Sequence, residues 1–474
     1  MKLEFFGAAG EVTGSCHVLT VADKKILLDC GLIQGGRKHE SRNREPWPFD
    51  PGSIDAVVLS HAHIDHSGRL PRLIRDGFEG PVYAQRATRD LCRIMLKDAG
   101  FLAEKEAESE NRKRQRKGLA LVRPLYTMDD AKASMRSFKG IGYDERRRIL
   151  PGVEIRFRDA GHILGSAMVE LWLREGGVAR KLVFSGDIGH HGAPILRDPS
   201  VITEADAVLM ESTYGDRLHR SREETIRELA QIFRDARHDR GNILIPAFAV
   251  GRSQELLYLF SQHQADWGME NWRVFLDSPM AIQATETYAR HSHLHDSDAA
   301  ELWRLRGNGS RLLPHFQATR TAQQSMALNR IRQGAIILAG SGMCEGGRIK
   351  HHLKNNIWRK GCHVIIVGYQ AQGTLGRRLV DGADHIRLWG EAIKVSARIH
   401  TVGGLSAHAD QDGLVAWYAG FDQRPPLFLV HGENKAQHAL AERLRDDLQA
   451  DVGIAQRGQV LDLTDLRSVR RAAA

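Results

Sequence analysis

Four side chains of the kinds that bind metal ions lie within one short stretch of this sequence. His61, His63, Asp65 and His66 belong to the segment HAHIDH, which follows the apolar run AVVLS. Imidazole together with carboxylate suits zinc or a similar divalent ion, and the absence of nearby thiolates argues against a purely structural zinc site. In an extended loop, alternation puts His61 and His63 on one side and the other two side chains on the opposite side. One loop can then serve two metal ions.

Two metal ions need more ligands than this segment supplies. Further candidates stand behind other apolar runs: His162 in DAGHILGSA, Asp187 in FSGDIG and His431 in LVHGE. A solvated, histidine-rich loop is the alternative interpretation of HAHIDH, but four ligand side chains so close behind a strand are rare without a metal. The pattern therefore predicts a metal centre assembled from several loops.

The elements that must position these side chains are short strands. The runs KKILLDCG, IDAVVLSHAH, KLVFSGDIG and AVLMEST each pass through aliphatic residues and stop at a candidate ligand or acid, so we expect functional side chains at strand ends. Between them, the charged stretch of residues 101–118 predicts an exposed helix. Its run RKRQRK could contact phosphates or act as a nuclear address, but a solvated helix face is the favoured interpretation.

From about residue 213 onward, strands and helices alternate. Ser221 and Glu224 make a capping box before a helix, and strands follow at NILIPAF, VFLDSP, AIILAG and HVIIVGY. This alternation predicts a parallel sheet with crossover helices. After about residue 390 the pattern of the first part returns. We therefore expect one domain formed by residues 1–212 and 391–474, interrupted by an inserted domain of residues 213–390.

Length and composition agree with a folded protein of two or three domains. The chain has 474 residues, and Lys plus Arg exceed Asp plus Glu by 67 − 58 = 9, which favours a polyanionic partner such as nucleic acid. The five cysteines include no CxxC pair, which argues against a disulfide framework. Glu4 and Glu11 interrupt the N-terminal region, and no apolar segment approaches the roughly 20 residues that cross a bilayer. We expect a cytoplasmic protein with no membrane partner.

Taken together, the motifs resemble a known family. HAHIDH, GHILGSA, FSGDIG, ESTYGDR, GSGMCEGGR, GYQAQGTLG, LSAHAD and LVHGE, in this order over about residues 1–440, are similar to the β-CASP branch of the metallo-β-lactamase superfamily. Its members include RNase J and the nuclease subunit of the cleavage and polyadenylation machinery, and this chain looks most like bacterial relatives of that subunit. The resemblance implies an α/β fold: an αββα metallo-β-lactamase sandwich with an inserted α/β β-CASP domain.

The resemblance also implies roles for individual residues. One metal ion would be bound by His61, His63 and His162, and the other by Asp65, His66 and His431. Asp187 would bridge the two ions, and Asp29 would orient ligands without contacting a metal. Glu211 and His408 match two further family motifs and form a candidate acid pair, so that Asp65, Glu211 and His408 make up the expected catalytic residues. The cofactor would be two Zn²⁺ per chain, with Mn²⁺ as an alternative.

Phosphodiester hydrolysis explains why such residues would be needed. Two metal ions about 3.5–4 Å apart generate a hydroxide nucleophile and neutralise the phosphoryl oxygens. The departing ribose oxygen needs a proton, and a positioned imidazolium contributes about a hundred- to ten-thousandfold. His408 is the candidate donor, with Glu211 keeping it oriented and protonated; a structural histidine in a tight turn is the alternative.

The segment GSGMCEGGR lies between an apolar strand and a helix. Glycines in such a loop let backbone N–H groups approach an anion, and Arg348 could add a bidentate contact. A flexible strand-to-helix turn is the alternative. With the family resemblance, we expect Ser341, Gly342, Arg348 and His351 to contact substrate phosphates.

The expected function is therefore a metal-dependent ribonuclease that hydrolyses single-stranded RNA, with endonucleolytic and 5′-to-3′ exonucleolytic action both open. The family's DNA-directed members typically carry Val where this chain has His431, so His431 favours RNA over DNA. Alternatives are a small-molecule metallo-hydrolase acting on a thioester or lactone, and a non-catalytic RNA-binding scaffold subunit. The sequence is also compatible with a homodimer.

Overall fold

The computed structural model describes residues 1–306 and 313–473, and the chain divides into two compact units. Unit 1 consists of residues 1–193, 198–218 and 408–474, and unit 2 of residues 194–197 and 219–407. The second crossing point differs from the expected residue 390, because β19 (Arg398–Thr401) pairs with β16 (His363–Ile366) in the sheet of unit 2. Among the described residues, no helix is both long and apolar enough to span a bilayer.

Unit 1 contains two seven-stranded sheets. The first runs in the order β22 (Val460–Asp462), β1 (Lys2–Gly7), β2 (Cys16–Val21), β3 (Lys24–Leu28), β4 (Ala56–Val58), β5 (Val82–Gln85), β6 (Phe138–Ile141). The second runs in the order β21 (Val452–Ile454), β20 (Leu427–Val430), β11 (Ala207–Glu211), β10 (Val178–Phe184), β9 (Ala167–Glu175), β8 (Val153–Asp159), β7 (Arg147–Leu150).

The two sheets of unit 1 face each other across a shared core. Alternate side chains of each strand point inward, so that Leu3 and Phe5 of β1 meet Phe157 of β8, Val169 of β9 and Phe184 of β10. The β9–β10 hairpin closes through two glycines at positive φ, as the twist of antiparallel strands favours.

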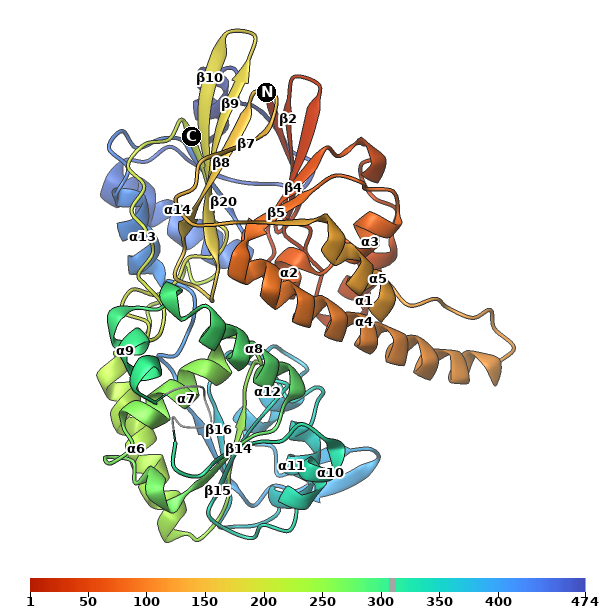
Figure 1. Ribbon diagram of the computed structural model, residues 1–474, viewed down its shortest axis with the longest axis vertical. Coiled ribbons are helices and arrows are strands. Elements are labelled where there is room, and N and C mark those ends of the chain that lie inside the picture. The colour runs from red at the N-terminus through yellow and green to blue at the C-terminus, as the bar shows by residue number, and fades with distance from the viewer. Residues whose placement is uncertain (307–312, 474) are drawn as a thin grey trace. The chain divides into compact units, whose positions relative to one another are not determined.

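Helices cover the outer faces of unit 1. On the second sheet, α13 (Gln411–Ala419) and α14 (Asn434–Leu448) pack through Leu414 and Leu440 against Val183 and Met210. Helices α3 (Leu70–Arg75), α4 (Arg86–Gln115) and α5 (Met128–Ser134) cover the first sheet (Figure 1). Further helices of unit 1 are α1 (Gly36–Glu40), α2 (Ile64–Ser67) and α15 (Leu466–Ala473). These four layers confirm the predicted αββα sandwich.

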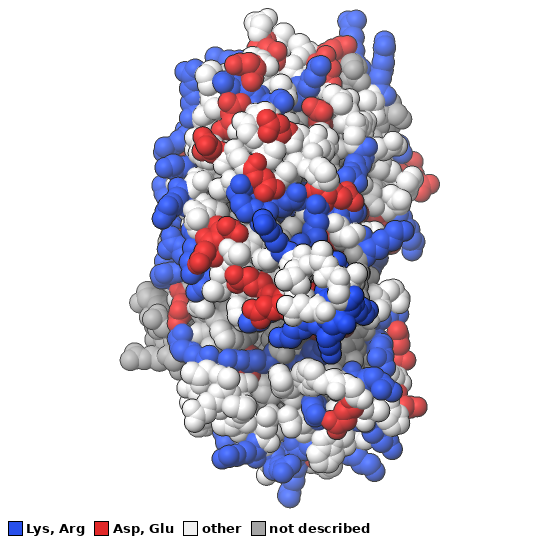
Figure 2. All heavy atoms as spheres, turned by 90° about the vertical axis from the view of Figure 1, so that its right-hand side faces the viewer, with Lys and Arg blue, Asp and Glu red and all other residues white. Residues whose placement is uncertain are grey.

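The exposed helix predicted for residues 101–118 is the second half of α4, which ends at Gln115. Its last turn carries Arg112, Lys113 and Arg114, where cations complement the negative end of the helix dipole. The chain that returns from it is tied to the helix by Asn111, whose side chain exchanges two hydrogen bonds with the backbone of Val122. Figure 2, which looks onto the side from which α4 projects, shows Lys and Arg side chains gathered beside uncharged residues.

Unit 2 is built on one parallel sheet with helices on both faces, which confirms the predicted inserted α/β domain. The strand order is β14 (Phe316–Ala318), β13 (Arg273–Leu276), β15 (Ala335–Ala339), β12 (Ile243–Pro246), β16, β19. One face packs on α6 (Arg222–His238), α7 (Arg252–Gln262) and α8 (Pro279–Arg290). The other packs on α11 (Ile349–Asn356), α12 (Leu375–Val380) and the hairpin β17 (His385–Leu388)–β18 (Glu391–Lys394). Two further helices are α9 (Ser297–Arg306) and α10 (Ala322–Leu328).

Alternation along β15 explains the double-sided packing of unit 2. Ile336 and Leu338 point to the face covered by α6 to α8, and Ile337 and Ala339 to the opposite face. Because both faces of the sheet are buried, the strands of unit 2 consist of nearly continuous runs of aliphatic residues.

Candidate metal centre

The candidate ligands all lie in unit 1, on loops or turns that follow strands. β4 leads to the HAHIDH segment, β8 to His162, β10 to Asp187 and β20 to His431. The expected extended loop is found only as far as His63, because α2 begins at Ile64 and carries Asp65 and His66 on one helical turn. Ser67 stabilises this turn by donating from its hydroxyl to the carbonyls of Ala62 and His63.

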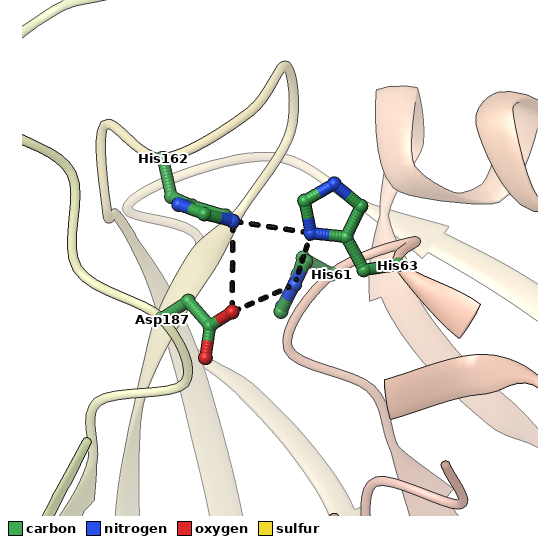
Figure 3. A group of neighbouring side chains, drawn as sticks. All are labelled: His61, His63, His162 and Asp187. Atoms are coloured by element: carbon green, nitrogen blue, oxygen red, sulfur yellow. Dashed lines mark hydrogen bonds and ion pairs between the residues drawn. The ribbon is translucent and has the colours of Figure 1, made fainter. Parts of the chain in front are cut away.

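The first group of ligands consists of His61, His63, His162 and Asp187, whose candidate atoms lie within 4.8 Å of one another. Nδ1 of His63 lies 3.1 Å from Nε2 of both His61 and His162. Oδ2 of Asp187 lies 3.3 Å from Nε2 of His61 and 3.5 Å from Nε2 of His162 (Figure 3). Three ring nitrogens and one carboxylate oxygen thus converge on a single point.

The second group consists of Asp65, His66 and His431. Nε2 of His66 lies 3.0 Å from Nε2 of His431, which lies 3.5 Å from Oδ2 of Asp65. The Asp187 carboxylate also faces this group, because its Oδ1 lies 3.2 Å from Nε2 of His66 and 3.6 Å from Nδ1 of His431. One carboxylate therefore presents a different oxygen to each group.

The electrostatics of the centre fit a divalent cation. Burial and repulsion from His61 lower the pKa of His63 to about 3, and burial also lowers the pKa of His61 and His162, which favours the neutral imidazole that binds a metal. Two facing ring nitrogens can share at most one proton. Oδ1 of Asp187 is buried, and although it lies 3.2 Å from Nε2 of His66, it forms no hydrogen bond of acceptable geometry with a described residue. A bound cation would satisfy all of these atoms at once.

Asp29 orients the His66 ring of the second group from the side away from the centre. Its Oδ2 lies 2.7 Å from Nδ1 of His66, which directs the other ring nitrogen, Nε2, toward the centre. Burial lowers the pKa of His66, but the carboxylates of Asp187 and Asp29 outweigh it and raise that pKa well above its ordinary value. Asp29 also accepts hydrogen bonds from the backbone N–H and hydroxyl of Ser60 and from the hydroxyl of Ser15.

Several supporting residues escaped the sequence analysis although they lie inside or beside the motifs. Ser60 directly precedes HAHIDH, and Thr213 of ESTYGDR places its hydroxyl 3.1 Å from Nδ1 of His431. Ser166 of GHILGSA accepts a hydrogen bond from the backbone of His162. Gly31 is required by close packing, since a Cβ there would lie 1.5 Å from the carbonyl oxygen of Asp65. Their positions inside or directly beside the quoted motifs were the sign in the sequence that these residues support the site.

His408 and Glu211 form a pair beside the centre. Nδ1 of His408 lies 3.1 Å from both carboxylate oxygens of Glu211, and the His408 ring lies 4.4 Å from that of His162. Burial opposes charge on His408, yet Glu211 and Asp187 raise its pKa to about 9. Glu211 is fully buried and held by the backbone N–H of Ile188, 2.6 Å from its Oε1. The carboxylates therefore favour a protonated imidazole at the edge of the candidate metal centre.

The four candidate phosphate-binding residues lie in unit 2. Ser341 accepts a hydrogen bond from the backbone of Gly346, and the carbonyl of Gly342 accepts one from Gln370. Arg348 donates to Asp277 and to the carbonyl of Thr319. His351 stacks on Trp389 with ring centroids 4.6 Å apart. To contact a phosphate, Arg348 would have to use N–H groups that do not already donate to Asp277 or Thr319.

Asp277, which binds Arg348, is the centre of a buried polar cluster. Its carboxylate, which is inaccessible to solvent, accepts hydrogen bonds from Thr319, from Ser325 at 2.6 Å and from Arg348 at 2.7 Å, and lies 2.6 Å from Nε2 of His352. Burial opposes ionisation of Asp277, but its hydrogen bonds with His352, Ser325 and Thr319 lower its pKa to about 2. The cluster ties the ends of β13 and β14 to α10 and α11.

Replacing Asp277 with Ala is expected to lower the free energy of unfolding by about 3–5 kcal/mol, because the buried side chains of His352, Ser325 and Thr319 lose the carboxylate with which they pair. Urea denaturation followed by circular dichroism measures this. Since the pKa of Asp277 is depressed, its contribution is complete above the ordinary value of 3.8 and is lost as the pH falls toward 2. Asp381→Ala removes an exposed partner of Arg377 and should change stability by less than about 1 kcal/mol. Equal effects of the two substitutions would contradict this account.

Comparison with known proteins identifies the family. Three family models match: the metallo-beta-lactamase superfamily over residues 9–247, the Beta-Casp domain over 253–379, and the Zn-dependent metallo-hydrolase RNA specificity domain over 392–455. A protein of Enterococcus faecalis V583 described as of unknown function shares the fold, with a TM-score of 0.53 at 15% identity over 97% of this chain and 99% of its own.

Curated relatives match over nearly the whole chain. Ribonuclease TTHA0252 of Thermus thermophilus is 39% identical over 444 residues, which cover 94% of this chain and 96% of the relative. Transcription termination factor FttA of Methanocaldococcus jannaschii is 30% identical over 455 residues, which cover 94% of this chain and 69% of the relative. With its four layers, its inserted parallel sheet and its histidine-rich centre, the chain belongs to the β-CASP branch of the metallo-β-lactamase superfamily.

Proposed function

We propose that this protein is a metal-dependent ribonuclease that hydrolyses phosphodiester bonds of single-stranded RNA. The observation that carries the proposal is the convergence of two ligand groups on the two oxygens of Asp187, beside the paired Glu211 and His408. Supporting it are a relative named a ribonuclease, a matching RNA specificity domain and a net charge of +9.

Two Zn²⁺ ions, or Mn²⁺ in their place, are the proposed cofactors. His61, His63 and His162 would hold one ion, Asp65, His66 and His431 the other, and Asp187 both. When bound, such ions lower the pKa of water and neutralise charge on the phosphoryl oxygens. Asp29 keeps the ring of His66 turned so that Nε2, and not Nδ1, faces the centre.

His408 is the proposed acid for the departing ribose oxygen. Glu211 engages Nδ1, so the proton would leave from the second ring nitrogen, Nε2, as the bond between phosphorus and the ribose oxygen breaks. Glu211 keeps the imidazolium charged and fixes its orientation. Unit 2 would supply phosphate contacts from Ser341, Gly342, Arg348 and His351. A cytoplasmic location and a homodimer stay predictions.

The test is cleavage of a 5′-labelled single-stranded RNA and a DNA of the same sequence by purified protein with zinc, with manganese or with a chelator. We expect the RNA to be cut only when metal is present. Internal fragments would identify an endonuclease, and immediate release of labelled mononucleotide a 5′ exonuclease. If neither nucleic acid were cut with either metal, the ribonuclease proposal would fail, and a screen of thioesters and lactones would test the small-molecule hydrolase instead.

A further inference from the structure

The tip of the β17–β18 hairpin in unit 2 has an unusual residue. Leu388 pairs with Glu391, which leaves a two-residue turn of Trp389 and Gly390, both at positive φ (+49° and +88°). Such turns favour Asn or Asp followed by Gly, because most side chains crowd the backbone at positive φ. A tryptophan at the first position costs conformational free energy, and a strained position that persists often has a function.

Trp389 is not needed to anchor the hairpin to the domain. Ile386, Leu388 and Ile393 already fix the hairpin to the domain, since they are 1%, 1% and 6% exposed within the core beneath α11. Trp389 itself is 58% exposed. An exposed tryptophan alone does not mark a binding surface, but tryptophan is enriched where partners bind, and packing does not account for it at this strained turn.

The neighbours of Trp389 suit a nucleic acid. The His351 ring stacks on the indole at 4.6 Å and 30°, and Nζ of Lys350 lies 5.6 Å from the indole centroid. Lys350 forms no ion pair with any residue that the structure describes, and its ammonium also donates to the carbonyl of Glu345 in the glycine-rich loop, 3.4 Å away. An exposed tryptophan, a lysine that forms no ion pair with the described residues and the glycine-rich loop thus lie side by side.

We propose that Trp389, stacked on His351, is a platform on which a base of single-stranded RNA stacks, with Lys350 contacting a neighbouring phosphate. This inference rests on the proposed ribonuclease function and adds the residue that holds the substrate. Stacking accepts any base, because every base has an aromatic face, but it requires a base that is not paired within a duplex. Trp389 lies between the stretches matched by the Beta-Casp and RNA specificity models, at residues 253–379 and 392–455, so neither describes it.

The experiment compares Trp389→Leu with the wild type in binding and cleavage of a single-stranded RNA and in binding of a duplex. Leucine keeps an apolar cover on the hairpin but removes the aromatic face. We expect the dissociation constant for the single strand to rise roughly five- to hundredfold, with KM rising more than kcat falls and binding of the duplex little changed. Trp389→Phe should restore most of the affinity.

The matched control is Trp358→Ala, which removes another exposed tryptophan of unit 2 (51% exposed) and should bind RNA like the wild type. Lys350→Ala should reduce the slope of log affinity against log salt by about one. If Trp389→Leu bound RNA as tightly as the control, or changed only the oligomeric state seen by light scattering, the platform would be ruled out. A wild-type protein that neither binds nor cuts RNA would instead overturn the proposed function.

Discussion

Asp187→Ala is expected to remove bound metal and to slow RNA cleavage roughly a thousandfold or more, because several kcal/mol of charge stabilisation are lost with the ions. The two carboxylate oxygens of Asp187 lie 3.3 Å from Nε2 of His61 and 3.2 Å from Nε2 of His66. A single substitution therefore removes a candidate ligand from both groups. Mass spectrometry of metal content, together with initial cleavage rates, measures the two effects.

Two companion variants sharpen this test. Asp187→Asn keeps the volume of the side chain but offers one carbonyl oxygen, so it should also lose cleavage while the protein stays folded. Asp129→Ala removes an acid of unit 1 whose side chain is 88% exposed, and it should keep full metal content and rate. An Asp187→Ala protein that kept two ions per chain and the wild-type rate would refute the bridging role.

The second large effect is expected for His408→Ala, which should lower kcat about a hundred- to ten-thousandfold while metal content stays at the wild-type level. The physical reason is the loss of the proton for the departing ribose oxygen, which His408 holds because Glu211 lies 3.1 Å from its Nδ1. Single-turnover cleavage and metal analysis of the same preparation measure both quantities.

A changed leaving group separates acid catalysis from a structural role. Sulfur leaves without needing a proton, so an RNA with sulfur in place of the departing oxygen should be cut by His408→Ala at a rate near that of the wild type. Glu211→Gln, which keeps the shape of the side chain but removes its charge, should show a smaller loss with the ordinary substrate and the same recovery. If His408→Ala lost its metal ions, or if sulfur brought no recovery, His408 would not be the acid.

Much of the candidate metal centre could be predicted from the sequence because its candidate ligands are concentrated in short motifs. His61, His63, Asp65 and His66 lie within six consecutive positions behind one strand, so they stay close together however the rest of the chain folds. The structure groups His61 with His63 and Asp65 with His66, as expected, but the backbone conformation that produces this grouping differs from the expected one. Asp65 and His66 separate from the first two histidines because α2 begins at Ile64, and not because an extended loop alternates.

Contacts between distant parts of the chain that lie outside the quoted motifs could not be predicted, because spacing along the sequence carries no information about them. Asp277 meets His352 from 75 positions away, and neither lies in a motif that suggests a partner. The hydrogen bond between Asp29 and Ser60 depends on which strands become neighbours. The position of Trp389 could not be predicted either, because a lone tryptophan in a sequence indicates neither its exposure nor its backbone conformation.

The order in which the chain emerges during synthesis has a consequence for the centre. Its parts are separated by unit 2, since Glu211 precedes residues 219–407 while His408 and His431 follow them. A growing chain that has reached Glu211 holds His61, His63, His162 and Asp187, yet it must still gain His408 and His431. At about 5–20 residues per second, ribosomes need roughly 10–40 s to cover that interval. The candidate centre of a nascent chain beside its own messenger RNA is thereby incomplete until residue 431 has been made.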